Sequence, residues 1–396
     1  MVITLKEIFT NEWDRFVINS DSNELKRPAV KRNVWKLINC KTLKMGIQAY
    51  SCEKGDHVMF VANTCKSRFC PSCGYKANLN WLNGLLNRLI PCTYQHLVFS
   101  LPLELRGVFK CNRRVISTSM YRAISRSIQQ FNRRSNIIGG EFGVLHTFGS
   151  ERKFHPHFHI MRTRGGINLE TEKWEDSSYI PEKYLKSAWK SKFLSQLRKA
   201  YAKGDLWFWG SGKEFYLLLN KLYEKNWHVY VRSEPVDDCL SISYIGRYVK
   251  RAPFSQRLIA DYKKGKHVKL QWKTAKGKKL SSWQAYPVPV FEFMESLIVH
   301  IPNRYDHLVY YSGLFSPAQK KRLYSKAMQH FEKQIKEAKV FTWRRLKKFN
   351  WKSDPLKCPK CGGEMKFVRM IRFQKAETVL FEIENYQMVV KGLDTS

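Results

Sequence analysis

The stretch Phe154-His155-Pro156-His157-Phe158-His159-Ile160 places three of the chain's 11 histidines at every second position of an apolar segment. Because a β-strand sends alternate side chains to one face, this spacing directs His155, His157 and His159 to the same side of a sheet. Neutral imidazole is the commonest metal ligand, so two of these histidines predict half of a metal site. The alternative is a polar strand face that carries solvated histidines.

The segment before this strand predicts the partner of the histidine strand. Residues 141–148 have the pattern of a strand, and a short turn would join the two into a hairpin. If Glu151-Arg152 are the central turn residues, His146 lies directly across from His157 on the same face. His146 is then the third ligand beside His157 and His159.

His155 is the competing third ligand, and in this register it pairs opposite Phe148. A shift of one residue in the turn would undo the pairing, because it moves every side chain to the other face. Further segments predict strands at 95–102 and 226–231, two helices within 1–45, and helices at 104–135, about 238–250 and 290–300. Strands joined partly by hairpins and mixed with helices predict an α+β fold, with an antiparallel sheet covered on one side by helices.

Charge points to a polyanionic partner. The 396 residues include 70 Lys and Arg against 33 Asp and Glu, a formal net charge of +37. Such an excess destabilises a compact chain through self-repulsion unless a polyanion lies against it. The basic residues alternate with aromatic ones, as in 341–351, and aromatic faces stack on unpaired bases. We therefore expect DNA or RNA as partner, single strands above all, and no membrane, since no apolar run approaches the ~20 residues of a span.

Cysteines indicate structural zinc. The sequence has no signal-peptide pattern, so the expected location is cytoplasmic. Because disulfides are rare in that reducing compartment, we expect the ten cysteines to be metal ligands or buried thiols. Tetrahedral zinc needs four nitrogen or sulfur ligands. The candidate ligands form one ordered cluster, in which the first choice is Cys52, His57, Cys70 and Cys73, with Cys65 able to replace His57.

A further CxxC motif, a knuckle that could hold zinc, lies in Cys358-Pro359-Lys360-Cys361-Gly362-Gly363. It lacks obvious partners nearby, so the sequence leaves its zinc binding open. The other cysteines, Cys40, Cys92, Cys111 and Cys239, are expected to be ordinary buried thiols.

A pair of tyrosines adds a nucleophile. In Tyr244-Ile245-Gly246-Arg247-Tyr248-Val249-Lys250-Arg251 the spacing of four residues places both phenols on one helix face. Aromatic core packing explains such a pair when it stands alone. Here it stands with three cations, which lower a phenol pKa and hold phosphates. Attack of a phenol on a metal-polarised phosphodiester would give a phosphotyrosine ester and free a sugar hydroxyl.

The ordered motifs resemble the HUH endonucleases, and more closely the two-tyrosine rolling-circle transposases of bacterial insertion sequences, the IS ninety-one-like family. The matching segments are Cys65-Lys-Ser-Arg-Phe-Cys70-Pro-Ser-Cys73, Leu145-His146-Thr-Phe-Gly149, His155-Pro-His-Phe-His159, Tyr244-Ile-Gly-Arg-Tyr248-Val-Lys-Arg251, and His300-Ile-Pro-Asn through Tyr310-Tyr311-Ser-Gly-Leu314.

This resemblance implies that His157 and His159 bind a catalytic Mg²⁺ or Mn²⁺ and that Tyr244 and Tyr248 are the nucleophiles. It also implies an N-terminal zinc-binding module that reads the ends of the element, and action on single-stranded DNA. The chain departs from the family in two places: the zinc module has Cys52-Glu-Lys-Gly-Asp-His57 where a CxxC is usual, and Ala252 stands one turn past Tyr248, where a metal ligand is usual. The second departure strengthens His146 as the third ligand.

The resemblance and the residues together predict three consecutive domains: a helical and zinc-binding DNA-recognition domain at 1–85, an HUH-type nuclease domain at 86–312, and a basic helical C-terminal region with the CxxC knuckle at 313–396. The predicted function is a transposase that cleaves and rejoins single-stranded DNA at element ends in the bacterial cell, near the nucleoid. The expected DNA-binding cations are Arg68, Arg247, Lys250 and Arg251. A rolling-circle replication initiator or relaxase has the same chemistry, and a zinc-dependent DNA-binding regulator without catalysis is the alternative from another class.

Overall fold

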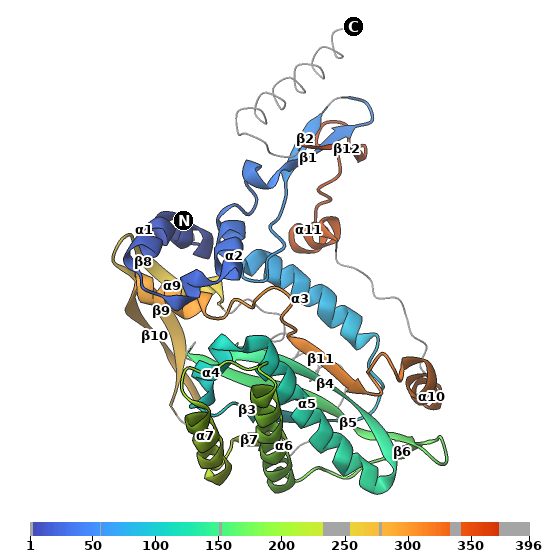
Figure 1. Ribbon diagram of the computed structural model, residues 1–396. Helices are drawn as coiled ribbons and strands as arrows, with labels where there is room; N and C mark the ends of the chain where they lie inside the picture. Colours follow the sequence, from blue (N-terminus) through green and yellow to red (C-terminus); the bar gives the residue numbers. More distant parts are fainter. Residues whose placement is uncertain are drawn as a thin grey trace. The chain divides into compact units, whose positions relative to one another are not determined.

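The structure is a computed structural model that describes residues 3–55, 57–149, 153–232, 254–276, 279–332 and 342–371 (Figure 1). Its mixture of helices and antiparallel sheets confirms the predicted α+β class. The chain forms two compact units: unit 1 contains Met1–Asn83, Lys250–Ile301 and Lys339–Ser396, and unit 2 contains Gly84–Val249 and Pro302–Ala338. This division differs from three consecutive domains, because strands and helices formed late in the chain pack on the N-terminal segment.

Unit 2 is built on a six-stranded sheet in which consecutive neighbours follow the order β11-β4-β5-β3-β7, with β6 paired to β5. All of these pairs are antiparallel. The strands are β3 (Tyr94–Ser100), β4 (Ile137–Phe148), β5 (Phe154–Asn168), β6 (Trp174–Asp176), β7 (Val229–Val231) and β11 (Val309–Gly313). The long central pair, β4 and β5, forms the hairpin expected around the histidine strand.

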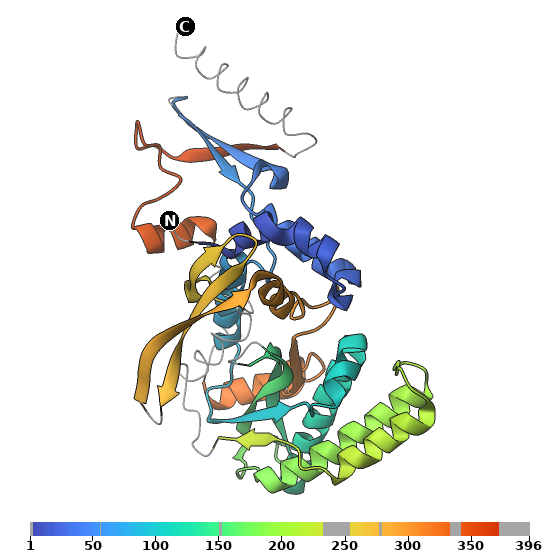
Figure 2. The same ribbon diagram turned by 90° about the vertical axis from the view of Figure 1, so that its left-hand side faces the viewer.

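Helices cover one face of this sheet (Figures 1 and 2). They are α4 (Leu105–Cys111), α5 (Arg113–Asn132), α6 (Glu182–Ala202) and α7 (Gly212–Glu224), and a shorter helix, α10 (Ser325–His330), follows a π-helical turn at Lys320–Tyr324. On the covered face, Phe158 and Ile160 of β5 are fully buried in the core. A Cβ on Gly143 of β4 would lie 2.6 Å from both Ile160 and Tyr121, so the close approach of α5 to the sheet requires glycine there.

Alternation along the strands assigns the histidines to the opposite face. His157 and His159 flank Phe158 in sequence, and the pleat turns them away from the helical core. Their cross-strand neighbours on β4 are His146 and Val144. The apolar residues of β5 therefore pack in the helical core, and its histidine row lies on the opposite face.

Unit 1 combines a helical cluster with two small antiparallel sheets. Its helices are α1 (Leu5–Asn19), α2 (Pro28–Ile38), α3 (Pro71–Leu86), α9 (Val290–Ile298) and α11 (Trp343–Trp351). One sheet has the order β10-β9-β8, with β8 (Ile259–Lys263), β9 (His267–Lys276) and β10 (Lys279–Pro289); the other has the order β12-β1-β2, with β1 (Ile47–Cys52), β2 (Val58–Ala62) and β12 (Met365–Ile371).

Local signals explain where the helices of unit 1 begin. The Thr4 hydroxyl accepts from the Glu7 amide and the Glu7 carboxylate accepts from the Thr4 amide, a capping box that starts α1. Pro28 occupies the first turn of α2, where its missing N–H costs nothing. The apolar faces of α1, α2 and α9 meet in one buried cluster, which includes Phe9, Val34 and Phe293.

Most of the predicted elements are confirmed with shifted ends. The helix expected at 104–135 is divided at Asn112 into α4 and α5, because the Asn112 amide side chain bonds to the carbonyls of Val108 and Trp207. The strand expected at 226–231 is confined to Val229–Val231. The helix expected at about 238–250 lies outside the described residues. None of the described helices is long and apolar enough to cross a membrane.

Candidate metal centres and catalytic site

Three histidines of unit 2 converge on the face of the sheet opposite the helical core. The ligand atoms of His146, His157 and His159 all lie within 4.8 Å of one another. His146 on β4 pairs directly with His157 on β5, which confirms the register predicted for the hairpin. The ring centroids lie 4.6 Å apart for His146 and His159 and 5.0 Å apart for His157 and His159. These distances suit three imidazoles around one ion.

His155 is not a member of this group of ligand atoms, although its ring centroid lies 5.2 Å from that of His157. A register shift between His146 and Phe148 pairs Phe148 with Phe154, so the prediction that His155 pairs opposite Phe148 is wrong. The extra residue of such a bulge re-aims the side chains beyond it. The Nδ1 atom of His155 instead accepts from the guanidinium of Arg106.

Hydrogen bonds fix which ring nitrogens face the centre. The Nδ1 atom of His157 lies 2.8 Å from the carbonyl oxygen of His155, to which it can only donate. The Nδ1 atom of His159 lies 3.0 Å from Nε2 of His96. The two Nε2 atoms of His157 and His159 then point toward each other at 3.2 Å. With Nδ1 protonated, Nε2 of His157 keeps its lone pair for a metal, and Nε2 of His159 does so in the tautomer that donates from Nδ1 to His96.

His96 is a site residue that the sequence analysis missed. It lies on β3, opposite Met161 of β5, and therefore on the same face as the triad. Its ring stacks on that of His159, with centroids 5.2 Å apart and planes inclined by 8°. The predicted strand at 95–102 contained this histidine, but nothing in the sequence specified that β3 would pair with β5. Its position is suited to orienting His159.

Burial keeps these imidazoles neutral. Desolvation lowers the pKa of His157 to about 4 and that of His96 to about 4. Burial also holds the pKa of His159 well below its usual range, aided by the neighbouring His157. A ring that is neutral at pH 7 can act as a ligand without first losing a proton. The donor set therefore fits a divalent cation.

The other predicted catalytic residues fall outside the described residues. These are the tyrosines and the cations of their predicted helix, Tyr244, Arg247, Tyr248, Lys250 and Arg251. Their roles stay predictions.

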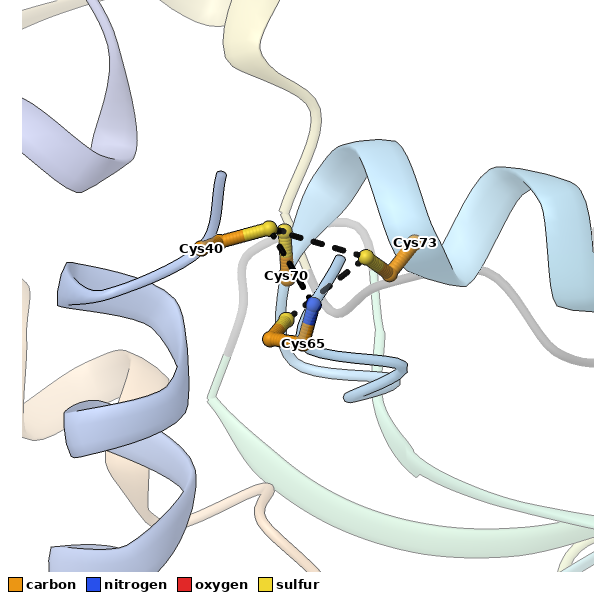
Figure 3. Close-up of side chains that lie close together, drawn as sticks. All are labelled: Cys40, Cys65, Cys70 and Cys73. Atoms are coloured by element: carbon orange, nitrogen blue, oxygen red, sulfur yellow. Dashed lines mark hydrogen bonds between the residues drawn. The ribbon is translucent and has the colours of Figure 1, made fainter. Parts of the chain in front are cut away.

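Four cysteines of unit 1 form a compact cluster, shown in Figure 3: Cys40, Cys65, Cys70 and Cys73. The Sγ atom of Cys73 lies 3.7 Å from that of Cys40 and 3.6 Å from that of Cys65, and Cys70 Sγ lies 3.8 Å from Cys40 Sγ. Four sulfurs at about 2.3 Å from a tetrahedral zinc are about 3.8 Å apart. The cluster therefore has the dimensions of a closed structural zinc site.

These cysteines come from three segments of the chain. Cys40 follows the end of α2, Cys65 lies in the loop after β2, and Cys70 and Cys73 lie just before and in the first turn of α3. The hydrogen bond from the Cys65 thiol lowers the pKa of Cys40 to about 7. The prediction that Cys40 is an ordinary buried thiol is therefore wrong, because it completes the set of four.

Cys52 and His57 are not members of the four-cysteine cluster. Cys52 instead groups with Cys358 and Cys361, while His57 belongs to no such group among the described residues. The predicted single cluster is thus divided, because β1 carries Cys52 away from the helices and toward β12. Arg68, predicted to bind DNA, is half-buried beside the cysteines, and burial lowers its pKa to about 10.

The chain is similar to known transposases over most of its length. Residues 8–101 match the family model described as "Transposase zinc-binding domain", and residues 140–323 match the one described as "Putative transposase". The first match contains the four-cysteine cluster and the second contains the three histidines of the triad.

Two curated relatives agree with these matches. The chain is 27% identical over 354 residues to "Transposase for insertion sequence element IS801" of Pseudomonas savastanoi pv. phaseolicola, which covers 85% of this chain and 83% of the relative. It is 25% identical over 297 residues to "Putative transposase y4qJ" of Sinorhizobium fredii, with 72% of this chain and 74% of the relative covered. No solved structure matches the chain. The ordered domain matches and these relatives show that the chain belongs to the insertion-sequence transposases that carry an N-terminal transposase zinc-binding domain.

Proposed function

We propose that this transposase cleaves and rejoins single-stranded DNA at the ends of its element by HUH chemistry, with a tyrosine nucleophile and a divalent cation. The observation that carries the proposal is the group of His146, His157 and His159 on one face of a central antiparallel hairpin. These imidazoles lie on the face opposite the helical core, and burial lowers the pKa of His157 and His159 so that both rings are neutral at pH 7.

The three imidazoles would hold Mg²⁺ or Mn²⁺ and leave its remaining positions to water and DNA oxygens, which these ions prefer. A bound ion supplies charge that polarises the scissile phosphodiester. The chain's own groups orient the ligands: the carbonyl of His155 fixes His157, and Nε2 of His96 fixes His159. The first contact requires the tautomer of His157 whose Nε2 faces the ion, and the second is compatible with the same tautomer of His159.

The proposed nucleophile is the phenol oxygen of Tyr244 or Tyr248, as the family resemblance implies. The oxygen loses its proton and attacks phosphorus, and the bond from phosphorus to the 3′ oxygen breaks. That 3′ oxygen takes up a proton and leaves as a sugar hydroxyl, while the 5′ end remains on the enzyme as a phosphotyrosine ester. The reverse step, with a 3′ hydroxyl as attacking group, rejoins strands without ATP.

The charge of the chain supports a nucleic-acid substrate. The net charge of +37 gives a strong sequence-independent attraction to phosphates. We assign recognition of the element ends to the zinc-binding domain and phosphate contacts to Arg68, Arg247, Lys250 and Arg251. The attraction should weaken steeply with added salt, since each phosphate contact releases counterions.

A cleavage assay tests the proposal. The purified chain is incubated with labelled single-stranded DNA from its own element ends and Mg²⁺ or Mn²⁺, and the products are separated on a denaturing gel. We expect a covalent protein–DNA adduct that is absent from the Tyr244→Phe/Tyr248→Phe double variant. His157→Ala should lose the adduct but still bind the DNA.

The matched control is His155→Ala, which removes a histidine of the same strand that lies outside the triad and leaves the main-chain carbonyl in place. It should retain the adduct. DNA binding without adduct or cleavage in either metal would refute the proposal and favour a regulator without catalysis. An adduct that persists in the double tyrosine variant would refute the assignment of the nucleophiles.

A further inference from the structure

A second sulfur cluster lies outside the four-cysteine site. The Sγ atoms of Cys52, Cys358 and Cys361 all lie within 4.8 Å of one another, and Cys52 Sγ is 3.1 Å from Cys361 Sγ. The side chains of Cys52 and Cys358 are only 4% and 3% exposed. The match to the zinc-binding domain ends at residue 101, so two of these three cysteines lie beyond it.

Strand pairing brings these distant residues together. β12 adds to β1 as an antiparallel neighbour, and Cys52 pairs with Met365 at the end of this ladder. Lys366 forms an ion pair with Glu53 beside the same end. The cluster therefore rests on a three-stranded sheet and does not depend on a chance approach of loops.

The C-terminal cysteines form a tight knuckle. The Cys358 amide donates to the carbonyl of Gly363 at 2.8 Å, and the Gly362 amide donates to the carbonyl of Cys358 at 2.9 Å. Gly362 has φ of +69°, a backbone conformation that favours glycine. A Cβ on Gly363 would lie 3.3 Å from Cys361 Sγ and 4.0 Å from Cys52 Sγ, so glycine leaves this space to the sulfurs.

Ion pairs anchor the knuckle to its surroundings. The Arg344 guanidinium and the Lys348 ammonium of α11 both bind the carboxylate of Asp354, and Arg344 also binds Glu364. These ion pairs hold both ends of the knuckle near α11.

We propose that Cys52, Cys358 and Cys361 bind a second zinc ion, which joins the N-terminal zinc-binding domain to the C-terminal segment of the chain. Two buried sulfurs and one half-buried sulfur, held by a sheet end and a knuckle, supply three of the four ligands that a structural zinc takes. A disulfide would leave the third sulfur without a role.

The two zinc sites should differ in how tightly they hold their ions. Four thiolates close the first site, whereas three leave one tetrahedral position of the second for water or for a residue that turns toward it. His57 is placed for this, since its carbonyl oxygen accepts from the Cys52 amide across the same turn. The second zinc should therefore exchange faster.

Zinc stoichiometry tests the proposal on the full chain, purified under reducing conditions. Elemental analysis should find two zinc ions per chain, and a colorimetric chelator should release them in a fast and a slow phase. The Cys358→Ser/Cys361→Ser variant should keep one zinc and lose the fast phase, and Cys52→Ser should do the same. The zinc retained in the four-cysteine site reports that unit 1 is still folded.

The matched control is Cys111→Ser, which removes an exposed cysteine outside both clusters and should leave two zinc ions. Two tightly bound ions in the Cys358→Ser/Cys361→Ser variant would overturn the proposal. So would one ion in the unaltered chain with a single release phase, or a peptide map that finds Cys52 and Cys361 disulfide-linked. None of these readouts depends on DNA cleavage, so the result stands apart from the proposed catalytic function.

Discussion

Replacing His96 by phenylalanine tests whether a residue outside the triad prepares the catalytic metal site. The substitution keeps an aromatic ring against His159 but removes the nitrogen that lies 3.0 Å from His159 Nδ1. A buried donor left without a partner costs about 1–3 kcal/mol. The His159 ring can escape this cost by changing tautomer or turning, and either change withdraws Nε2 from the ion.

At about 1.4 kcal/mol per tenfold change, this cost predicts that His96→Phe weakens Mn²⁺ binding by about 10–100-fold. Electron paramagnetic resonance of free Mn²⁺ measures the affinity directly on zinc-loaded protein without DNA. His155→Ala is the control, because it keeps the carbonyl that holds His157, and it should bind Mn²⁺ as the unaltered chain does.

If His96→Phe bound Mn²⁺ within about twofold of the unaltered chain while His157→Ala failed to bind, the orienting role of His96 would be refuted. A loss confined to the rate of DNA cleavage, with Mn²⁺ affinity unchanged, would also contradict the reasoning, because the hydrogen bond acts on the ligand.

Three further predictions concern stability. The folded pKa of His157 is about 4 against 6.5 for an ordinary histidine, so the unfolded chain binds the proton first, and this group alone should lower stability by about 2 kcal/mol between pH 7 and pH 5 without added metal. His96 and His159, whose pKa values are also lowered, add to the fall; urea unfolding measures the total, and His157→Gln should reduce it by about 2 kcal/mol. Cys40→Ser should remove one zinc ion and lower the thermal midpoint, whereas Cys111→Ser should change neither, as elemental analysis and calorimetry would report. Gly313→Ala should lower the free energy of unfolding by about 3 kcal/mol, because φ is +57° and the new Cβ would lie 1.9 Å from a backbone oxygen. Gly204→Ala should lower it by only about 1 kcal/mol in the same unfolding assay, because φ is +76° there but no atom lies near the new Cβ.

The histidine face was predictable from the sequence because its signals are local. Alternating histidines define one strand face, and a short turn links that strand to its partner, so the pairing of His146 with His157 followed from counting residues. The same count failed two residues further on, at Phe148, because a bulge inserts a residue without a sequence signal that the count could detect.

The contacts that the sequence did not predict are those between distant segments. His96 and His159 are 63 residues apart, and Cys52 and Cys361 are 309 residues apart. Strand order decides both contacts, and many strand orders are compatible with the same hydrophobic pattern. Cys40 was overlooked for a related reason, since it stands alone in sequence and acquires its partners only when α2 packs near the start of α3.

The pairing of β1 with β12 sets an order of events during synthesis. β1 is among the first strands to leave the ribosome, but its neighbour β12 and the knuckle cysteines belong to the last part of the chain that the structure describes. At about 5–20 residues per second, the intervening 300 or so residues delay this partner by about 15–60 s. Until then one edge of β1 stays unpaired and Cys52 lacks both of its sulfur neighbours. A chain that stops before residue 358 keeps that defect permanently, which makes it a better target for proteolysis than a chain that contains the knuckle and β12.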